Sequence, residues 1–329
     1  RAASGITRPQ ALGIDVHFAV EQKARAAAAW PVAFNGSGGV WRRAAIHDAG
    51  GWSADTLTED LDLSYRAWLR GWRVVYADHV TCPAEIPEDM LAFKAQQRRW
   101  ARGSTATARK LLPAIWRARQ SWGAKLEATL HLTHYAVHPL ILLSAALAIP
   151  LGWLAPLTSP VWTVLPALAM ATGGPIRMAL TAARDRGLCA RRTLIALCHV
   201  VLLGTGLALS NTIAVCRGLG ASDAVFERTA KGGLASSYLS AGDLLCVGEL
   251  LCGAACLGIA VHLGQNGVFA MVPFLLLYAF ALTQVGVGTL RDSLRARARL
   301  RARGTVTSFA PARPSRGAPD PARVPLVEV

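Results

Sequence analysis

The sequence has few acidic side chains and no C-x-x-C pair of cysteines. It carries 20 Asp and Glu against 35 Lys and Arg, a formal net charge of +15 at pH 7. Nucleic-acid binding is one interpretation of such an excess. The basic residues, however, stand beside long apolar runs, as in a membrane protein with Arg-rich cytoplasmic loops, so we expect no nucleic-acid partner. Four of the 7 cysteines lie in apolar runs, and we expect these four to be buried thiols in a reducing compartment: Cys198, Cys246, Cys252 and Cys256.

The sequence is rich in hydrophobic residues, which make up 53% of it, and its mean hydropathy is +0.33. Four runs come close to the roughly 20 residues that a helix needs to cross a bilayer. They are 132–154, 160–182, 243–263 and 268–290. A fifth run, 193–215, has basic residues at both ends, so we expect a re-entrant or interfacial helix there. The same rule places the Arg-rich segments 184–192 and 291–303 in the cytoplasm.

The composition divides the chain into four parts. Residues 1–117 are mixed and polar, and residues 118–131 are basic and amphipathic, typical of a helix that lies along a membrane surface. Residues 132–290 form the membrane region, which includes a basic loop at 224–233. Residues 291–329 form a basic, Pro-rich tail that we expect to be disordered.

The stretch TLTEDLDLSYRAWLRGW (56–72) predicts a helix in the polar part. Thr56 and Glu59 have the spacing of a capping box. Apolar residues recur at helical spacing, and Gly71 stands where the helix should end. Short apolar segments on either side, VAF at 32–34 and WRVVYADHV at 72–80, predict strands.

Three carboxylates, Glu59, Asp60 and Asp62, crowd the start of this helix. One interpretation is that they only complement the positive end of the helix dipole, worth about 0.3–1 kcal/mol each. The other is that crowding raises their pKa values and that one of them acts as a general base. Asp60 and Asp62 are not expected to share a metal ion, because residues two apart on a helix point to nearly opposite sides.

A second motif, QQRRW, places Gln96, Arg99 and Trp100 on one face of a predicted helix. A Trp ring offers a flat apolar surface to a sugar, while Gln and Arg offer hydrogen bonds and positive charge to a phosphate. The alternative is a helix that extends its arginines toward a membrane surface. Spacing alone favours neither interpretation.

Together, FNGSGGVWRRAAIHDAGGW, TLTEDLDLSYRAWLRGW and AFKAQQRRWARGS resemble the C-terminal half of the catalytic domain of membrane-embedded family 2 glycosyltransferases. These are the cellulose-synthase-like group, and the chain is similar to bacterial relatives of glucomannan and mannan synthases. Their T-E-D motif matches 58–60 and Q-Q-x-R-W matches 96–100. FERTAKGG resembles their gating loop F-x-V-T-x-K-G, with Phe226, Thr229 and Lys231 in register and Arg228 in place of Val.

The resemblance covers residues 10–290 and implies an α/β fold, the C-terminal half of a GT-A nucleotide-sugar transferase domain with a mostly parallel sheet, followed by an α-helical transmembrane bundle. It implies that Asp60 is the general base that takes a proton from the acceptor hydroxyl, with inversion at the donor sugar. It also implies substrate-binding roles for a set of other residues. That set is Glu59, Gln96, Gln97, Arg99, Trp100, Phe226, Thr229 and Lys231. For Asn35 and Ser37 two interpretations stay open, a substrate-binding role through a hydrogen bond to an acceptor sugar and a structural turn.

The partners implied are a UDP- or GDP-hexose donor, a growing glycan acceptor and membrane lipid. Such enzymes also carry, upstream, an aspartate that reads the nucleotide base and a D-x-D that holds Mg²⁺ or Mn²⁺, and nothing before Phe34 matches either. The chain opens with Arg1 instead of Met. We therefore expect an N-terminally truncated copy that lacks its metal ligands and binds its donor poorly.

The expected function is a processive, inverting β-glycosyltransferase that elongates a polysaccharide at the cytoplasmic face of a bacterial inner membrane. The alternatives are a non-processive lipid glucosyltransferase and a catalytically dead membrane protein. Two further features stay open. His131, His134 and His138 share a helical face, and they are either metal ligands or interfacial polar residues. Glu249 lies within a predicted span, where it either lines a channel or pairs with another residue.

Overall fold

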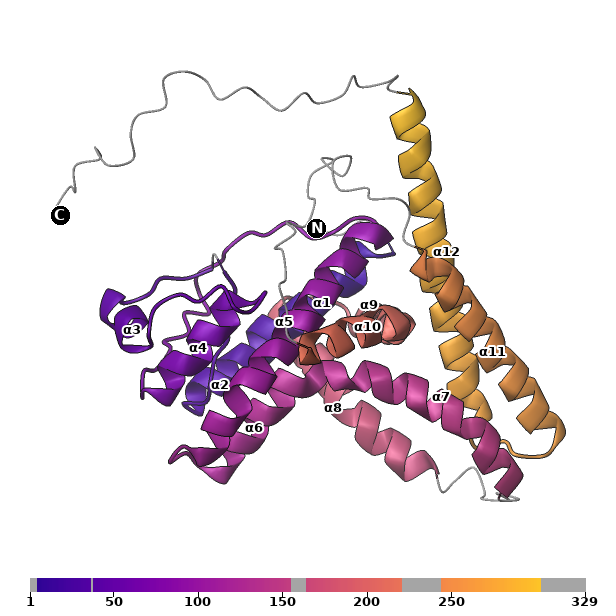
Figure 1. Ribbon diagram of the computed structural model, residues 1–329, viewed down its shortest axis with the longest axis horizontal. Helices are drawn as coiled ribbons and strands as arrows, with labels where there is room; N and C mark the ends of the chain where they lie inside the picture. The colour runs from indigo at the N-terminus through magenta and orange to yellow at the C-terminus, as the bar shows by residue number, and fades with distance from the viewer. Residues whose placement is uncertain (1–4, 37, 155–163, 221–243, 303–329) are drawn as a thin grey trace.

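The computed structural model describes residues 5–36, 38–154, 164–220 and 244–302 (Figure 1). Helices follow one another through these ranges. In chain order they are α1 (Thr7–Val16), the π-helix η1 (His17–Gln22), α2 (Lys23–Ala27), α3 (Arg43–Asp48), α4 (Glu59–Leu69), α5 (Met90–Arg117), α6 (Trp122–Thr133), the 3₁₀ turn η2 (His134–Ala136), α7 (Val137–Leu154), α8 (Val164–Asp185), α9 (Ala190–Gly206), α10 (Ala208–Leu219), α11 (Leu245–Gln265) and α12 (Val272–Ala302).

The predicted α/β fold with a mostly parallel sheet is wrong for the described residues, which contain no β-strand. A strand is stable only when a neighbour pairs its backbone N–H and C=O groups. The segment 72–80 is irregular and, apart from the half-buried Trp72 and Tyr76, exposed, with Val75 93% exposed. No second extended segment pairs with it in the described part of the chain, so its β-branched composition does not produce a strand.

In the segment 32–34, Val32 and Ala33 are buried and Phe34 is half-buried, yet side chains occupy the place that a neighbouring strand would take. The Gln22 side chain donates from Nε2 to the carbonyl of Ala33 at 2.6 Å. The backbone N–H of Phe34 donates to the Ser64 hydroxyl at 2.9 Å. Because these polar backbone groups are satisfied by side chains, the segment is held in place without a sheet.

Helix α4 begins at Glu59, with Thr58 at its N-cap and without a side-chain cap. The predicted capping box is therefore wrong, and Thr56 lies buried before the helix instead. Gly71 ends the helix as predicted, with φ at +90°. The apolar face of α4 packs on α5 and α6 in one cluster, composed of Tyr65, Trp68, Ala108, Leu111, Ile115, Ala124, Ala128 and Leu132.

Helix α5 links the polar part of the molecule to the apolar helices. It starts at Met90, where the Asp89 carboxylate accepts from the backbone N–H of Ala92 at 2.7 Å. Along its length it contacts α4, α6, α10 and α12. In Figure 1, α3 and α4 therefore lie at one side of α5 and the α11–α12 pair at the other.

Within the described residues, three helical stretches are long and apolar enough to cross a membrane: Trp122–Pro150, Leu245–Gln265 and Val272–Ala298. Helices α9 and α10 pass the same test together but are bent by 55°, as in a broken span or a re-entrant loop. The predicted span 160–182 overlaps α8, which is not among these stretches, and part of it lies outside the described residues. The number of crossings stays a prediction.

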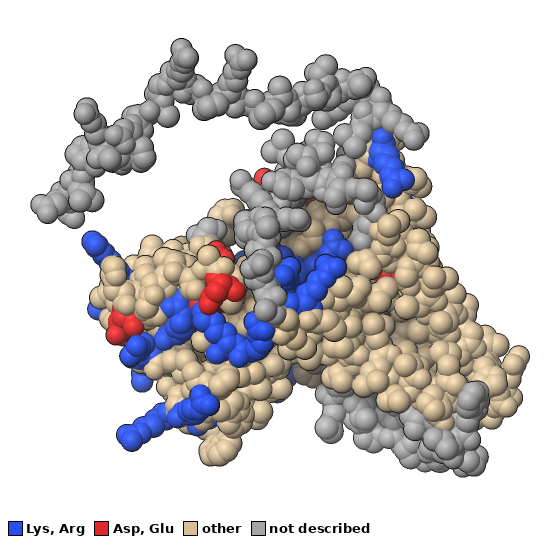
Figure 2. Space-filling model, in the orientation of Figure 1, with Lys and Arg blue, Asp and Glu red and all other residues tan. Residues whose placement is uncertain are grey.

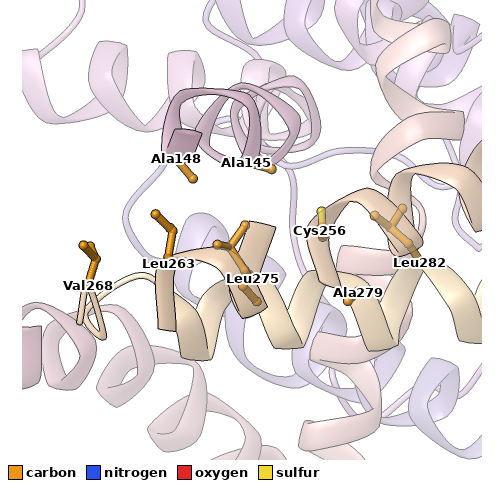
Figure 3. Close-up of a cluster of buried hydrophobic side chains, with 9 residues drawn as sticks. Ala145, Ala148, Cys256, Leu263, Val268, Leu275, Ala279 and Leu282 are labelled. Carbon is orange, nitrogen blue, oxygen red and sulfur yellow. The ribbon is translucent and has the colours of Figure 1, made fainter. Parts of the chain in front are cut away.

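Small residues bring the apolar helices together, as is common between membrane helices. A Cβ on Gly253 of α11 would lie 2.7 Å from Thr283 Oγ1 of α12, and one on Gly206 would lie 2.4 Å from the Ala281 carbonyl. Residues of α7, α11, α12 and the loop between the last two form a buried apolar cluster (Figure 3). Cys246 and Cys256 are buried as predicted and Cys252 is half-buried, but the prediction is wrong for Cys198, which is exposed. Helix α12 continues to Ala302, beyond the start of the predicted tail, and 303–329 lie outside the described residues.

Candidate active site

A loop and a helix start meet at Asp60. Its carboxylate is half-buried in the first turn of α4 and accepts a hydrogen bond from the backbone N–H of Leu61 at 2.8 Å. A Cβ placed on Gly36 would lie 3.7 Å from Asp60 Oδ2, so the exposed loop at 35–36 passes beside the carboxylate. Among the described residues, Asp60 has no ion pair.

The pKa of Asp60 is raised above its ordinary value chiefly by burial, which disfavours the charged form. The backbone N–H of Leu61 and the Arg99 guanidinium act in the opposite direction, and the neighbouring Glu59 carboxylate raises the pKa further. A carboxyl group with a raised pKa at the edge of an exposed loop is suited to accepting a proton.

Asp62 stands two residues later in a different environment. It is fully buried, 2.7 Å from Arg66 Nη2 and 2.9 Å from Lys110 Nζ. Arg66 in turn donates to the carbonyl of Gly51 at 2.8 Å and to that of Ala49. Asp62 therefore joins α4 to α5 and to the end of α3, while Asp60 faces the loop.

The start of α4 touches α5 where α5 has a glycine. A Cβ on Gly103 would lie 2.5 Å from Thr58 Cγ2, closer than real contacts allow. One turn further along α5, Thr107 Oγ1 is 3.3 Å from Thr58 Oγ1. The T-E-D motif thus sits directly on the helix that carries QQRRW.

Arg99 lies one turn before Gly103 on α5. Burial lowers its pKa, while the carboxylates of Asp60 and Glu59 raise it. Asp60 and Arg99 each affect the pKa of the other, so the two motifs, which are 36 residues or more apart in the sequence, lie near each other in space. Trp100 follows with 37% of its surface exposed, a ring accessible from solvent.

The glutamines of QQRRW are half-buried. The Tyr135 hydroxyl, from η2, donates to Gln97 Oε1 at 3.3 Å. On the other side of the site, the Ser64 hydroxyl donates to the carbonyl of Asp60 at 2.6 Å while it accepts from Phe34 N. Tyr135 and Ser64 were not predicted, because each contacts its partner only through the fold and no local pattern marks it.

Three predicted substrate-binding residues, Phe226, Thr229 and Lys231, lie outside the described residues, as does Ser37. The gating-loop prediction therefore stays a prediction.

The three histidines near the start of the membrane region have separate partners. Tyr65 Oη is 2.7 Å from His131 Nδ1, and His134 Nδ1 is 2.7 Å from the carbonyl of His131. His138 Nε2 is 2.9 Å from Asn211 Nδ2. Each of the three therefore has a hydrogen-bond partner within the protein, and their position at a membrane interface stays a prediction.

Mg²⁺ and Mn²⁺ prefer several oxygen ligands arranged around one point. Within the described ranges no group of three His, Cys, Asp or Glu comes together, and Asp60 and Asp62 face different partners. The described residues therefore do not fit such a metal site, and no step below depends on one.

Glu249 of α11 is fully buried, and its carboxylate lies 2.7 Å from Lys94 Nζ, which is fully buried as well. Lys94 also donates to the Thr289 hydroxyl of α12 at 3.3 Å. These contacts support the paired interpretation of Glu249 and join α5 to two candidate spans.

The surface of the part of the molecule that contains the candidate site is rich in basic side chains. Lys and Arg gather over the polar helices, whereas the surface near α7, α11 and α12 is almost uncharged except toward the C-terminal end of α12 (Figure 2). A half-buried carboxyl, an arginine and an exposed tryptophan on adjoining helices can accept a proton, neutralise an anion and stack on a ring.

Residues 10–174 match the family model described as "Glycosyl transferase family group 2". Over 115 residues the chain is 42% identical to glucomannan 4-beta-mannosyltransferase 1 of Oryza sativa subsp. japonica, an alignment of 35% of this chain with 22% of that protein. It is 41% identical over 115 residues, with the same coverage of 35% and 22%, to glucomannan 4-beta-mannosyltransferase 2 of Arabidopsis thaliana. Probable glucomannan 4-beta-mannosyltransferase 11 of Oryza sativa subsp. japonica is 36% identical over 169 residues, 49% of this chain and 29% of that protein. The chain thus spans less than a third of the length of these relatives, and no solved structure matches it.

Proposed function

Because the chain belongs to glycosyl transferase family group 2, we propose that it acts in a processive, inverting β-glycosyltransferase that elongates a polysaccharide from a nucleotide sugar. The donor is UDP- or GDP-hexose and the acceptor is the end of a growing glycan. The observation that carries this proposal is the contact between the start of α4 and the helix that carries QQRRW: a Cβ on Gly103 of α5 would overlap Thr58, two residues before Asp60. Asp60 lies beside the loop at 35–36, and Trp100 of α5 has an exposed ring.

In the proposed reaction, Asp60 takes the proton of one acceptor hydroxyl. The hydroxyl oxygen forms a bond to the anomeric carbon of the donor sugar from the side opposite to the diphosphate. The bond from that carbon to the diphosphate oxygen breaks, the nucleoside diphosphate leaves with the electron pair, and the anomeric configuration inverts. A sugar hydroxyl is a weak nucleophile until a base takes its proton, which is why a carboxyl of raised pKa suits this step.

The other motif residues bind the two substrates in this proposal. Trp100 stacks on the acceptor sugar, Gln96, Gln97 and Glu59 hold its hydroxyls, and Arg99 neutralises the leaving diphosphate. Asn35 binds the acceptor from the loop beside Asp60. By the resemblance of FERTAKGG to the gating loop, Phe226, Thr229 and Lys231 close over the nucleotide.

A requirement for Mg²⁺ or Mn²⁺ is also part of the proposal, with ligands other than the described residues. Chelation by EDTA should abolish transfer, and either cation should restore it. Transfer that persists undiminished in EDTA would reject the requirement.

The proposed location is the bacterial inner membrane, with the site at its cytoplasmic face and membrane lipid as a partner. The Arg-rich segments 184–192 and 291–303 support this orientation by the positive-inside rule. Three candidate spans support attachment by membrane crossing.

Product analysis tests the function. Membranes that contain the protein, expressed from its complete gene, are incubated with radiolabelled GDP-mannose or UDP-glucose, and the products are sized. A ladder of oligosaccharides supports elongation. A single-sugar glycolipid would support the alternative of a lipid glucosyltransferase, and no transfer from either donor would support a catalytically dead membrane protein.

A further inference from the structure

The loop beside Asp60 is connected to a buried glutamine. Gln22, the last residue of the π-helix η1, is almost completely buried. Its Nε2 donates to the carbonyl of Ala33 at 2.6 Å and to Asn35 Oδ1 at 3.2 Å. Its Oε1 accepts from Arg25 Nη1 at 3.4 Å. Both polar atoms of the Gln22 amide are therefore hydrogen-bonded.

The orientation of the Gln22 amide follows from the chemistry of two of these neighbours. A backbone carbonyl can only accept, so the Gln22 nitrogen must face Ala33. A guanidinium can only donate, so the Gln22 oxygen must face Arg25. Arg25 is itself held by Glu127, whose Oε1 is 2.5 Å from Arg25 Nε.

This orientation determines that of Asn35. Because the Gln22 nitrogen can only donate, Asn35 must turn its oxygen toward Gln22 and leave its Nδ2 hydrogens on the exposed side of the loop. Gly36, the next residue, passes beside Asp60. The loop thus presents a hydrogen-bond donor near a carboxylate that accepts.

We propose that Gln22 is a positioning residue that fixes Asn35 as a hydrogen-bond donor to an acceptor sugar hydroxyl beside Asp60. A hydroxyl that gives its proton toward a carboxylate keeps lone pairs that can accept from an amide N–H. Asn35 and Asp60 together therefore select a hydroxyl in one orientation. This inference rests on the proposed function, and it assigns a substrate class to the loop: the sugar end of a glycan primer.

The test is binding of a manno-oligosaccharide primer, or of the gluco-oligosaccharide if wild-type protein uses UDP-glucose, measured by calorimetry without donor. Gln22→Met keeps the size of the side chain and removes its donors, and Asn35→Ala removes the amide. Each should weaken primer binding about tenfold, the value of one hydrogen bond of roughly 1.4 kcal/mol. The double variant should also lose about tenfold, because Gln22 acts through Asn35. A loss of about a hundredfold in the double variant, or wild-type binding by Gln22→Met, would overturn the proposal.

Gln10 provides a matched control, because within the described residues its Nε2 donates to the backbone carbonyls of Ile6 and Pro87, at 3.0 and 2.9 Å, and not to the loop beside Asp60. Gln10→Met should leave primer binding unchanged. Asn35→Asp provides a second variant, and because Asn35 is exposed, this substitution does not alter the protein core. It keeps an oxygen toward Gln22 but has no donor, so it should bind as weakly as Asn35→Ala, and wild-type binding by Asn35→Asp would show that the donor is not used. Wild-type protein that binds neither primer would reject the proposed function and this inference together, whereas primer binding that Gln22→Met leaves intact rejects only the inference.

Discussion

Helix α5 carries charged residues in two contrasting environments. Near its start, Lys94 is fully buried against Glu249 and Thr289 of the candidate spans. Slightly more than one turn later comes Arg99, whose charge lowers the pKa of the half-buried Asp60, although burial keeps that pKa above its ordinary value. Lys94 and Glu249 form a fully buried ion pair, whereas Asp60 lies half-buried beside an exposed loop.

The difference separates a structural role from a chemical one. A buried pair at 2.7 Å holds helices together, and both of its side chains are fully buried, so a substrate does not reach them. A carboxyl whose charge is disfavoured by burial, and which lies beside an exposed loop, can take a proton from a ligand. Substitutions at the two places should therefore affect different properties.

Asp60→Asn should have the largest effect on activity. It removes the base while keeping the shape of the side chain, so transfer should fall about 10²–10⁴-fold, the usual contribution of general acid–base catalysis. The thermal midpoint should stay close to that of wild type. Sugar-transfer rates and thermal unfolding of the same preparation measure both, and undiminished activity in Asp60→Asn would show that Asp60 is no base.

Glu249→Leu should have its main effect on stability, in contrast to Asp60→Asn, whose main effect is on activity. Removal of one partner from a buried ion pair costs about 3–5 kcal/mol of stability, because the other charge stays in the protein interior. Adding Lys94→Met should recover much of that loss, since two apolar side chains can pack there. Thermal unfolding in detergent checks this, and a double variant no more stable than Glu249→Leu would contradict the account of Lys94 and Glu249 as a structural pair.

Some of this was predictable from the sequence and some was not. Helix α4, its end at Gly71 and the presence of QQRRW on a helix depend on periodicity and short motifs, which are local. The strands at 32–34 and 72–80 were predicted wrongly, because a strand depends on a partner that no local pattern specifies. Ser64 and Gln22 escaped notice for the same reason, since their bonds to Phe34 and Ala33 exist only once the chain is folded.

Gly103→Ala should have a smaller effect, and it should lower both stability and sugar-transfer activity. The new methyl group would overlap Thr58, so α4 must move away from α5, at a cost of about 1–3 kcal/mol, and Asp60 moves with it. Transfer should fall about tenfold for such a shift of the base. Gly13→Ala in α1 is the control, because nothing lies within 4 Å of its added Cβ. Equal behaviour of the two variants would mean that the α4–α5 contact does not position Asp60.

The smallest effects concern pH. Asp60 must be ionised to accept a proton, so transfer should fall on acidification through its pKa, which is raised by burial. Arg99 lowers that pKa and Glu59 raises it. The acid limb of kcat/KM should therefore move to higher pH in Arg99→Gln and to lower pH in Glu59→Gln, even where both variants are slower.

This pair of pH profiles tests most directly whether a carboxyl on α4 and a guanidinium on α5 share one reaction site. The kcat/KM for sugar transfer is measured from acid to neutral pH in wild type, Arg99→Gln and Glu59→Gln, with protein confirmed to be folded at each pH. Shifts of the acid limb in opposite directions are the predicted result. Acid limbs that coincide in all three proteins, or that shift in the same direction in both variants, would contradict it.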